Sequence, residues 1–142
     1  MHLKSWLIAS LVTLSTYGFA DTVVWKGTVK ADGSPSAVVT LALGQRYEIR
    51  VSGTMNLGNW WQNKEQLLND ACYEFSSNTT PTSQPAFKNS NNINVGDGKY
   101  HPDHIYQSNP FTAAQSGVHF WIHDKDYSDN SGELQVEVIS KG

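Results

Sequence analysis

The sequence predicts an all-β protein, a small antiparallel β-sandwich. Short segments rich in Val, Ile, Tyr, Phe and Trp recur along the chain, and turn residues such as Asp32-Gly33 and Ser131-Gly132 separate them. No stretch keeps the apolar spacing of a helix over three turns, although residues 60–68 fit one short helix. A packed pair of antiparallel sheets is the expected architecture. The expected strands are residues 23–30, 37–43, 46–52, 71–76, 117–123 and 133–139.

Two of these segments alternate apolar and polar residues with a period of two. That period places one face of a strand in a core and the other in water. Arg46, Glu48 and Arg50 are therefore expected on a solvent face. The residues expected in the core are Tyr47, Ile49, Val51, Leu134, Val136 and Val138.

The first twenty residues have the layout of a secretory signal peptide. Lys4 precedes an apolar run, and the small residues Gly18 and Ala20 follow it. The run is shorter than the roughly 20 residues that span a bilayer, which argues against a membrane anchor. We expect cleavage between Ala20 and Asp21, a secreted or periplasmic location, and a single domain over residues 21–142.

Charge and cysteine content exclude several classes of function. Without Lys4 the mature chain has 9 basic and 13 acidic residues, a formal charge of −4. This acidic excess, without a basic stripe, argues against nucleic acid as a partner. No later segment is long and apolar enough for membrane insertion. Cys72 is the only cysteine, so no internal disulfide forms, and we interpret it as a small buried hydrophobe.

Residues 124–132 hold the densest group of oxygen-bearing side chains. Asp124, Asp126, Asp129 and Asn130 lie within seven residues, between two expected strands. Calcium takes six to eight oxygen ligands from carboxylates, amides, main-chain carbonyls and water. A solvated β-turn also favours Asp, Asn, Ser and Gly for backbone reasons. Spacing alone leaves both interpretations open.

A second group combines aromatic and amide side chains. Trp60 and Trp61 are followed directly by Gln62. An exposed Trp stacks on the apolar face of a sugar ring, and amides form hydrogen bonds with its hydroxyls. Adjacent residues of a strand point to opposite faces, so at least one of the two Trp side chains is equally well explained as core.

A third group ends at His104. It contains His101, Asp103 and His104. Histidine side chains bind transition metals or act as an acid–base group. No third, distant partner is evident in the sequence. We therefore favour a surface loop or a sugar-contacting loop over a zinc enzyme. The sequence contains no Gly-x-Ser-x-Gly motif, phosphate-binding loop or zinc-protease helix.

Three separated pieces of the chain resemble the LecA-type calcium-dependent galactose-binding lectins of bacteria. Trp25-Lys26-Gly27 is similar to the opening strand of that family, and residues 44–58 are similar to a strand and loop that end in Leu57-Gly58. Residues 124–139 resemble its calcium loop and last strand. The resemblance implies a β-sandwich of galactose-binding-domain-like or jelly-roll type.

The resemblance also implies a ligand set for one Ca²⁺ ion. Leu57 would contribute its main-chain carbonyl, Asp124 its carboxylate, and Asp129 and Asn130 their side-chain oxygens. A further carbonyl would come from Tyr127 or Ser128. The loop is two residues shorter than in the family, Asp129 replaces an Asn, and Leu57 stands where the family has Tyr.

The function implied by this resemblance is that of a non-enzymatic lectin. Sugar hydroxyls would coordinate the ion, with galactosides or glycoconjugates as ligands and a homo-oligomer raising avidity. His101-Pro102-Asp103 matches a sugar-contacting segment of the family, but follows the Cys72 strand where the family segment precedes it. The sugar contacts expected here are Trp60, Trp61, Gln62, His101, Asp103, Asp124 and Asp129. The alternative is a calcium-stabilised interaction or inhibitor protein that binds no sugar.

Overall fold

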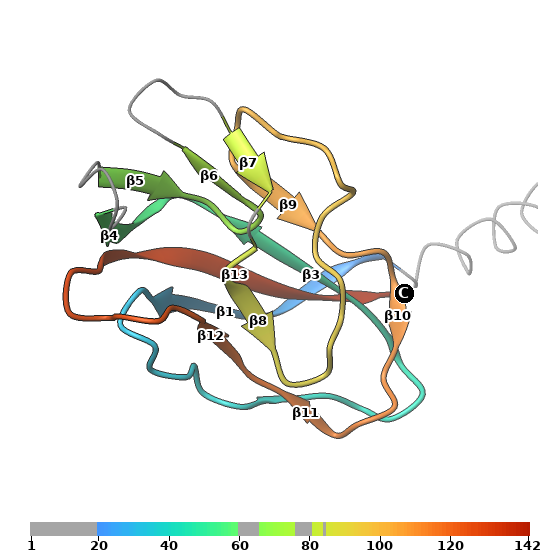
Figure 1. The fold of residues 1–142 in the computed structure, drawn as a ribbon. Helices are drawn as coiled ribbons and strands as arrows, with labels where there is room; N and C mark the ends of the chain where they lie inside the picture. Colours follow the sequence, from blue (N-terminus) through green and yellow to red (C-terminus); the bar gives the residue numbers. More distant parts are fainter. Residues whose placement is uncertain (1–19, 60–65, 76–80, 84) are drawn as a thin grey trace, which may run out of the picture.

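The computed structural model describes residues 20–59, 66–75, 81–83 and 85–142. Residues 1–19 of the expected signal peptide, and Trp60, Trp61 and Gln62, lie outside these ranges. The described residues contain no helix (Figure 1). Their strands are β1 (Thr22–Lys30), β2 (Val39–Thr40), β3 (Arg46–Ser52), β4 (Met55–Asn59), β5 (Gln66–Asn69), β6 (Tyr73–Phe75), β7 (Pro81–Ser83), β8 (Phe87–Asn89), β9 (Ile105–Gln107), β10 (Phe111–Thr112), β11 (Gly117–Val118), β12 (Phe120–Ile122) and β13 (Ser131–Lys141).

The long strand β13 organises the larger sheet. It pairs antiparallel with β1 on one side and with β3 on the other, and its first two residues pair with β4. Strands β5, β6 and β7 continue the sheet beyond β4, and β9 and β10 pair with β3. The predicted alternation explains this central position, because Leu134, Val136 and Val138 are fully buried on one face of β13.

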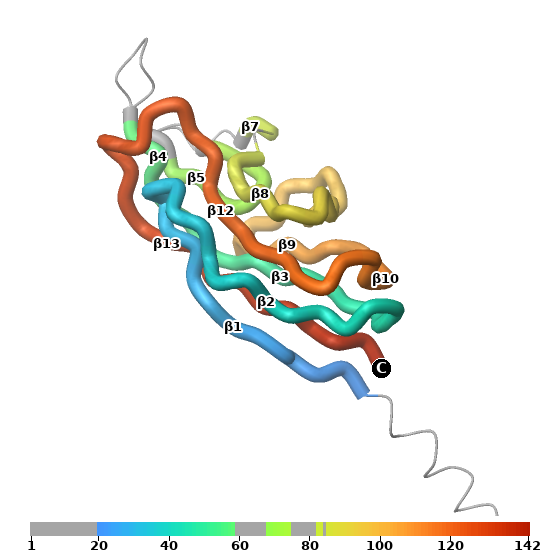
Figure 2. Tube along the Cα trace, turned by 90° about the horizontal axis from the view of Figure 1, so that it is seen from below, coloured from blue at the N-terminus to red at the C-terminus, as the bar shows by residue number. Residues whose placement is uncertain are grey.

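Two short antiparallel ladders, β2 with β11 and β8 with β12, form the second layer of the sandwich (Figures 1 and 2). Phe120 of β12 joins the layers, because its ring stacks on Trp25 of β1 at 5.9 Å and on Phe87 of β8 at 5.5 Å between centroids. The chain then crosses from β12 to β13, so residues 124–130 lie at one end of the sandwich. This confirms the predicted all-β antiparallel sandwich.

The sequence prediction is wrong in a few local details. Residues 66–69 are strand β5, not the end of a helix. Residues 117–123 form two strands, since the main chain of His119 bonds with Ser90 between them. Glu48, expected in water, is only 7% exposed. It lies 3.2 Å from the Lys141 ammonium, which compensates its charge.

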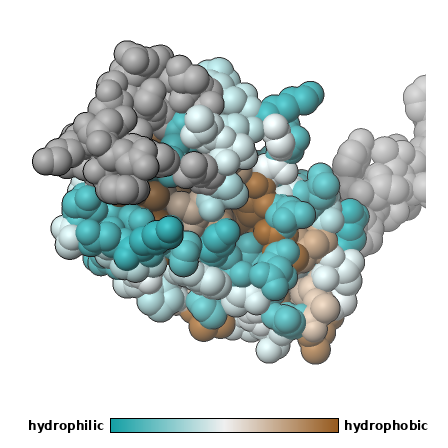
Figure 3. Space-filling model, in the orientation of Figure 1, coloured by the Kyte–Doolittle hydropathy of each residue, from teal (hydrophilic) through white to brown (hydrophobic). Residues whose placement is uncertain are grey.

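The visible surface is mainly hydrophilic, with hydrophobic residues in small separate patches (Figure 3). Val38 and Leu43 are the most exposed large hydrophobic residues among those described, each 67% exposed. Over the same ranges, no helix has the length and apolar character needed to cross a membrane.

Candidate functional site

The loop between β12 and β13 is held in one shape by its own polar side chains. The Tyr127 hydroxyl donates to the Ile122 carbonyl at 3.1 Å and accepts from the Asp124 main-chain N–H at 3.2 Å. Asp126 accepts from the N–H and the hydroxyl of Ser128. The Tyr127 ring also lies against Gly33, where a Cβ would be 2.7 Å from the ring. The expected ligand residues therefore sit on a preformed loop.

Two oxygens of this loop are buried and have no hydrogen-bond partner among the described residues. They are Oδ2 of Asp124 and Oδ1 of Asn130. The rest of each side chain is fixed, because Asp124 Oδ1 accepts from the Lys125 N–H at 2.6 Å and Asn130 Nδ2 donates to the Ala31 carbonyl at 2.8 Å. A buried polar atom without a partner costs about 1–3 kcal/mol. Such atoms indicate a partner other than the protein, typically a water or an ion.

The turn at Leu57-Gly58 lies against the same loop. A Cβ at Gly58 would overlap the carboxyl group of Asp129, so the carboxylate rests directly on the Gly58 backbone. Gly58 has a φ of +89°, and its N–H donates to Asn56 Oδ1 at 2.7 Å. A side chain at Gly58 would therefore be both strained and obstructed. The structure thus brings Leu57, Asp124, Asp129 and Asn130 to one end of the sandwich.

Strands β5 and β6 of the larger sheet add two residues near this loop that the sequence did not indicate. Met55 pairs with Asn69, and Asn69 pairs with Glu74, so the three side chains share one face of the sheet. That face is the interior, since Met55 is 2% exposed and Asn69 is fully buried. The side-chain Nδ2 and Oδ1 of Asn69 are buried and form no hydrogen bond among the described residues. The Asn69 amide is nevertheless near enough to Glu74 to act on that carboxyl.

Glu74 is half-buried and lies near Asp124. Burial raises the pKa of the Glu74 carboxyl, the Asn69 amide lowers it, and the negative charge of Asp124 raises it further. An inward Glu on a short strand was not evident from the sequence, because Tyr73-Glu74-Phe75 suggests a polar residue on the solvent face. Only the cross-strand register places it beside the loop.

These groups fit a hard cation such as calcium. In the described ranges no three His, Cys, Asp or Glu side chains converge closely enough to hold an ion by themselves. Calcium also accepts amide and main-chain carbonyl oxygens, which Asn130, Asn69 and the Leu57 turn provide. The carboxylates of Asp124 and Asp129 would supply the negative charge, and Glu74 lies near Asp124.

His101 and His104 face different carboxylates. Nε2 of His101 lies 3.0 Å from Oδ1 of the exposed Asp97. This hydrogen bond raises the pKa of the His101 ring. Nδ1 of His104 lies 3.1 Å from the buried Asp70. Asp103 accepts from the Ile105 N–H and shapes its own turn. The two rings therefore do not share one partner, and this arrangement gives no support to a common zinc site.

Comparisons with known proteins bear on the fold. No protein-family model matches the chain, and no curated protein matches it in sequence. Among solved structures, the chain is similar to one described as "EclA N-terminal domain; PllA-like lectin", with a TM-score of 0.52 and 20% sequence identity. The match covers 84% of this chain and 98% of that chain. At this identity the likeness establishes the shared β-sandwich fold.

Proposed function

We propose that this protein is an exported, calcium-dependent carbohydrate-binding protein without enzymatic activity. The observation that supports the proposal most directly is the pair of buried oxygens on Asp124 and Asn130 that lack a partner among the described residues. They lie on a fixed loop whose Asp129 carboxylate packs against Gly58 in the Leu57-Gly58 turn. The shared fold with a structure described as a lectin supports the same function.

In this proposal the chain binds a sugar by exposing one side of a bound calcium ion. Asp124, Asp129, Asn130, the Leu57 carbonyl and a carbonyl of Tyr127 or Ser128 would hold the ion. A bound calcium would offer open coordination positions to two neighbouring sugar hydroxyls. Asp124 and Asp129 would then accept hydrogen bonds from the same hydroxyls. Trp60, Trp61 and Gln62 follow β4 directly in the sequence and remain proposed sugar contacts. The proposed ligand is a galactoside.

A calorimetric titration tests this function. Galactose, glucose, mannose and fucose are each titrated into the unmutated protein in excess calcium and again in excess chelator. We expect galactose to release heat only in calcium, with a dissociation constant of about 10⁻⁵–10⁻³ M, because a single small site gains little binding energy. Calcium binding without any saccharide binding, on this panel or on a glycan array, would instead favour an interaction or inhibitor protein.

Glu74→Gln is expected to weaken calcium binding roughly tenfold, a size typical of groups that support a metal site. The change removes one negative charge near Asp124 and keeps the shape of the side chain. The metal-free variant should be at least as stable as the unmutated protein, because burial and Asp124 already disfavour the charged form of Glu74. Calcium titrations followed by thermal melting measure both effects.

Glu133→Gln is the matched control, since Glu133 lies exposed on β13. It should leave the calcium midpoint unchanged. If both variants bind calcium like the unmutated protein, Glu74 takes no part in the site, whereas the ligand set on the loop would stand.

A further inference from the structure

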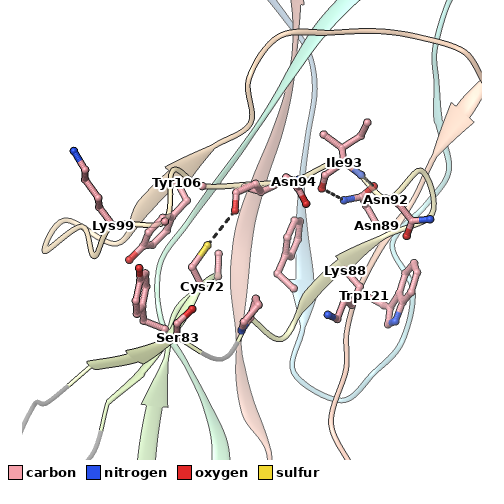
Figure 4. Close-up of a pocket in the computed structure, with 17 residues that line it drawn as sticks. Cys72, Ser83, Lys88, Asn89, Asn92, Ile93, Asn94, Lys99, Tyr106 and Trp121 are labelled. Carbon is pink, nitrogen blue, oxygen red and sulfur yellow. Dashed lines mark hydrogen bonds between the residues drawn. The ribbon is translucent and has the colours of Figure 1, made fainter.

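A cavity of about 500 Å³ lies between β6, β8, β12 and the segment 92–96 (Figure 4). No residue of the proposed calcium loop, residues 124–130, is among its described lining residues. Its volume is within the range of pockets that bind small molecules. Buried rings of Tyr73, Phe87 and Tyr106 contribute to its lining. In Figure 4, Lys88 and Trp121 lie side by side at one end, and Cys72 and Ser83 lie toward the other.

Buried polar groups fix the segment that covers this cavity. Asn89, which is 6% exposed, donates from Nδ2 to the Ile93 carbonyl at 2.8 Å and accepts from the Ile93 N–H at 3.0 Å. The Cys72 thiol donates to the Val95 carbonyl at 3.2 Å. Gly96 has a φ of +111°, and a Cβ there would lie 2.9 Å from the Cys72 sulfur. The cavity is therefore preformed and does not depend on a ligand to hold it open.

One end of the cavity combines an aromatic ring with a positive charge. Trp121 of β12 pairs directly with Lys88 of β8, so both side chains project from the same face of the ladder. That face is outward, since the neighbours Phe120 and Ile122 are fully buried. Trp121 is partly exposed, and the His119 ring lies 5.4 Å from it. Lys88 is exposed and has no ion-pair partner in the described part of the chain.

The covering segment adds polar groups to the lining but no acidic one. Asn92 and Asn94 are exposed and add amide groups on the covering segment. None of the described lining residues is Asp or Glu, although the whole chain has a net charge of −3. Lys99 also belongs to the lining, but its ammonium points away from the other labelled side chains (Figure 4). Lys88 is therefore the lining cation that lies beside Trp121.

We infer that this cavity is a second, calcium-independent binding site for a ring compound with an apolar face and one carboxylate, the chemistry of an acidic sugar. The Trp121 ring provides a surface on which a pyranose stacks. The Lys88 ammonium pairs with the carboxylate, and the amides of Asn92 and Asn94 meet ring hydroxyls. No Asp or Glu is among the described lining residues, and the negative charges of Asp70 and Asp97 act at the Cys72 end of the cavity, opposite Lys88. This site does not require the proposed calcium site.

Saturation-transfer NMR in excess chelator tests the inference, with galacturonic acid as probe and galactose as its neutral match. We expect transfer to galacturonic acid and a much weaker signal for galactose. Lys88→Gln should weaken galacturonic acid binding about tenfold, the size of one charge-assisted hydrogen bond. Lys30→Gln, on an exposed lysine of β1, should leave it unchanged. Asp124→Asn should also leave it unchanged, which separates this site from the calcium loop.

Several outcomes would overturn the second site. They are the absence of transfer in the unmutated protein, a signal that requires calcium, equal signals from the two sugars, and full binding by Lys88→Gln. Trp121→Leu provides a further measurement, because loss of the stacking ring should weaken binding while the pocket keeps its charge. Unchanged binding by this variant would contradict the proposed pose. Lys88 is exposed, so failure to fold does not explain a loss in Lys88→Gln.

Discussion

Asp124→Asn is expected to abolish the stabilisation of the folded protein by calcium. The amide keeps the oxygen that accepts from the Lys125 N–H but removes the charge beside the buried, unpartnered Oδ2. For the unmutated protein, calcium at a hundredfold excess over its dissociation constant would add about 2.7 kcal/mol to the free energy of unfolding. In a domain of this size that raises the melting temperature by roughly 10 °C. In Asp124→Asn the two melting curves, with calcium and with chelator, should coincide.

Asp126→Asn is the matched control for this experiment. It removes one charge from the same loop, keeps an oxygen that can accept from Ser128, and lies outside the proposed ligand set. Its calcium-dependent rise in melting temperature should persist. Equal melting of the unmutated protein with calcium and with chelator would refute the metal site, and with it the proposed mode of sugar binding.

Asp70→Ala is expected to have the largest effect on stability, a loss of about 3–5 kcal/mol. Asp70 is fully buried. Its carboxyl accepts from the N–H groups of Cys72 and Tyr73, at 3.0 and 2.6 Å, and from the Tyr106 hydroxyl at 2.9 Å. His104 Nδ1 lies 3.1 Å away. Removing the carboxyl leaves several buried donors without an acceptor, which is the most costly kind of polar substitution.

Two further variants separate burial from local turn geometry. Tyr106→Phe removes one donor and should cost about 1–2 kcal/mol. Asp32 is exposed but its carboxylate, like that of Asp70, accepts from the N–H two positions later, here that of Ser34. Asp32→Ala should therefore cost less than about 0.5 kcal/mol. Urea denaturation followed by fluorescence gives all three values. A loss below 1 kcal/mol for Asp70→Ala would show that the buried network contributes little.

The sequence by itself determined the fold class and the main strands. Alternation in residues 46–51 and 133–138 predicted the core of β3 and β13, and Ile49, Val51, Leu134, Val136 and Val138 are all essentially buried. A period of two is a local property, so it is visible without any knowledge of the strand partners. Glu48 departs from the pattern because its burial depends on Lys141, which lies 93 positions later and could not be paired with it from spacing.

The candidate site was only partly predictable for the same reason. Asp124, Asp129 and Asn130 form one local cluster, and a local cluster of oxygens can be recognised in a sequence. Spacing alone could not distinguish a cation loop from an ordinary turn, and the resemblance to lectins added Leu57. The structure adds that one oxygen each of Asp124 and Asn130 is buried without a hydrogen-bond partner among the described residues, and the proposed cation loop rests on this observation. That evidence depends on packing, because only folding removes these atoms from water.

Only the tertiary structure identified Asn69, Glu74 and the Lys88–Trp121 pair. Each depends on antiparallel register, which aligns residues that are far apart or that lie on strands of three or four residues. A shift of one residue in register would turn each side chain to the opposite face of the sheet. The local pattern therefore does not predict the face on which these side chains lie. The sequence determined the long alternating strands and where oxygen-bearing side chains cluster. The pairing of the strands decided which side chains face that cluster and which line the cavity beside β8 and β12.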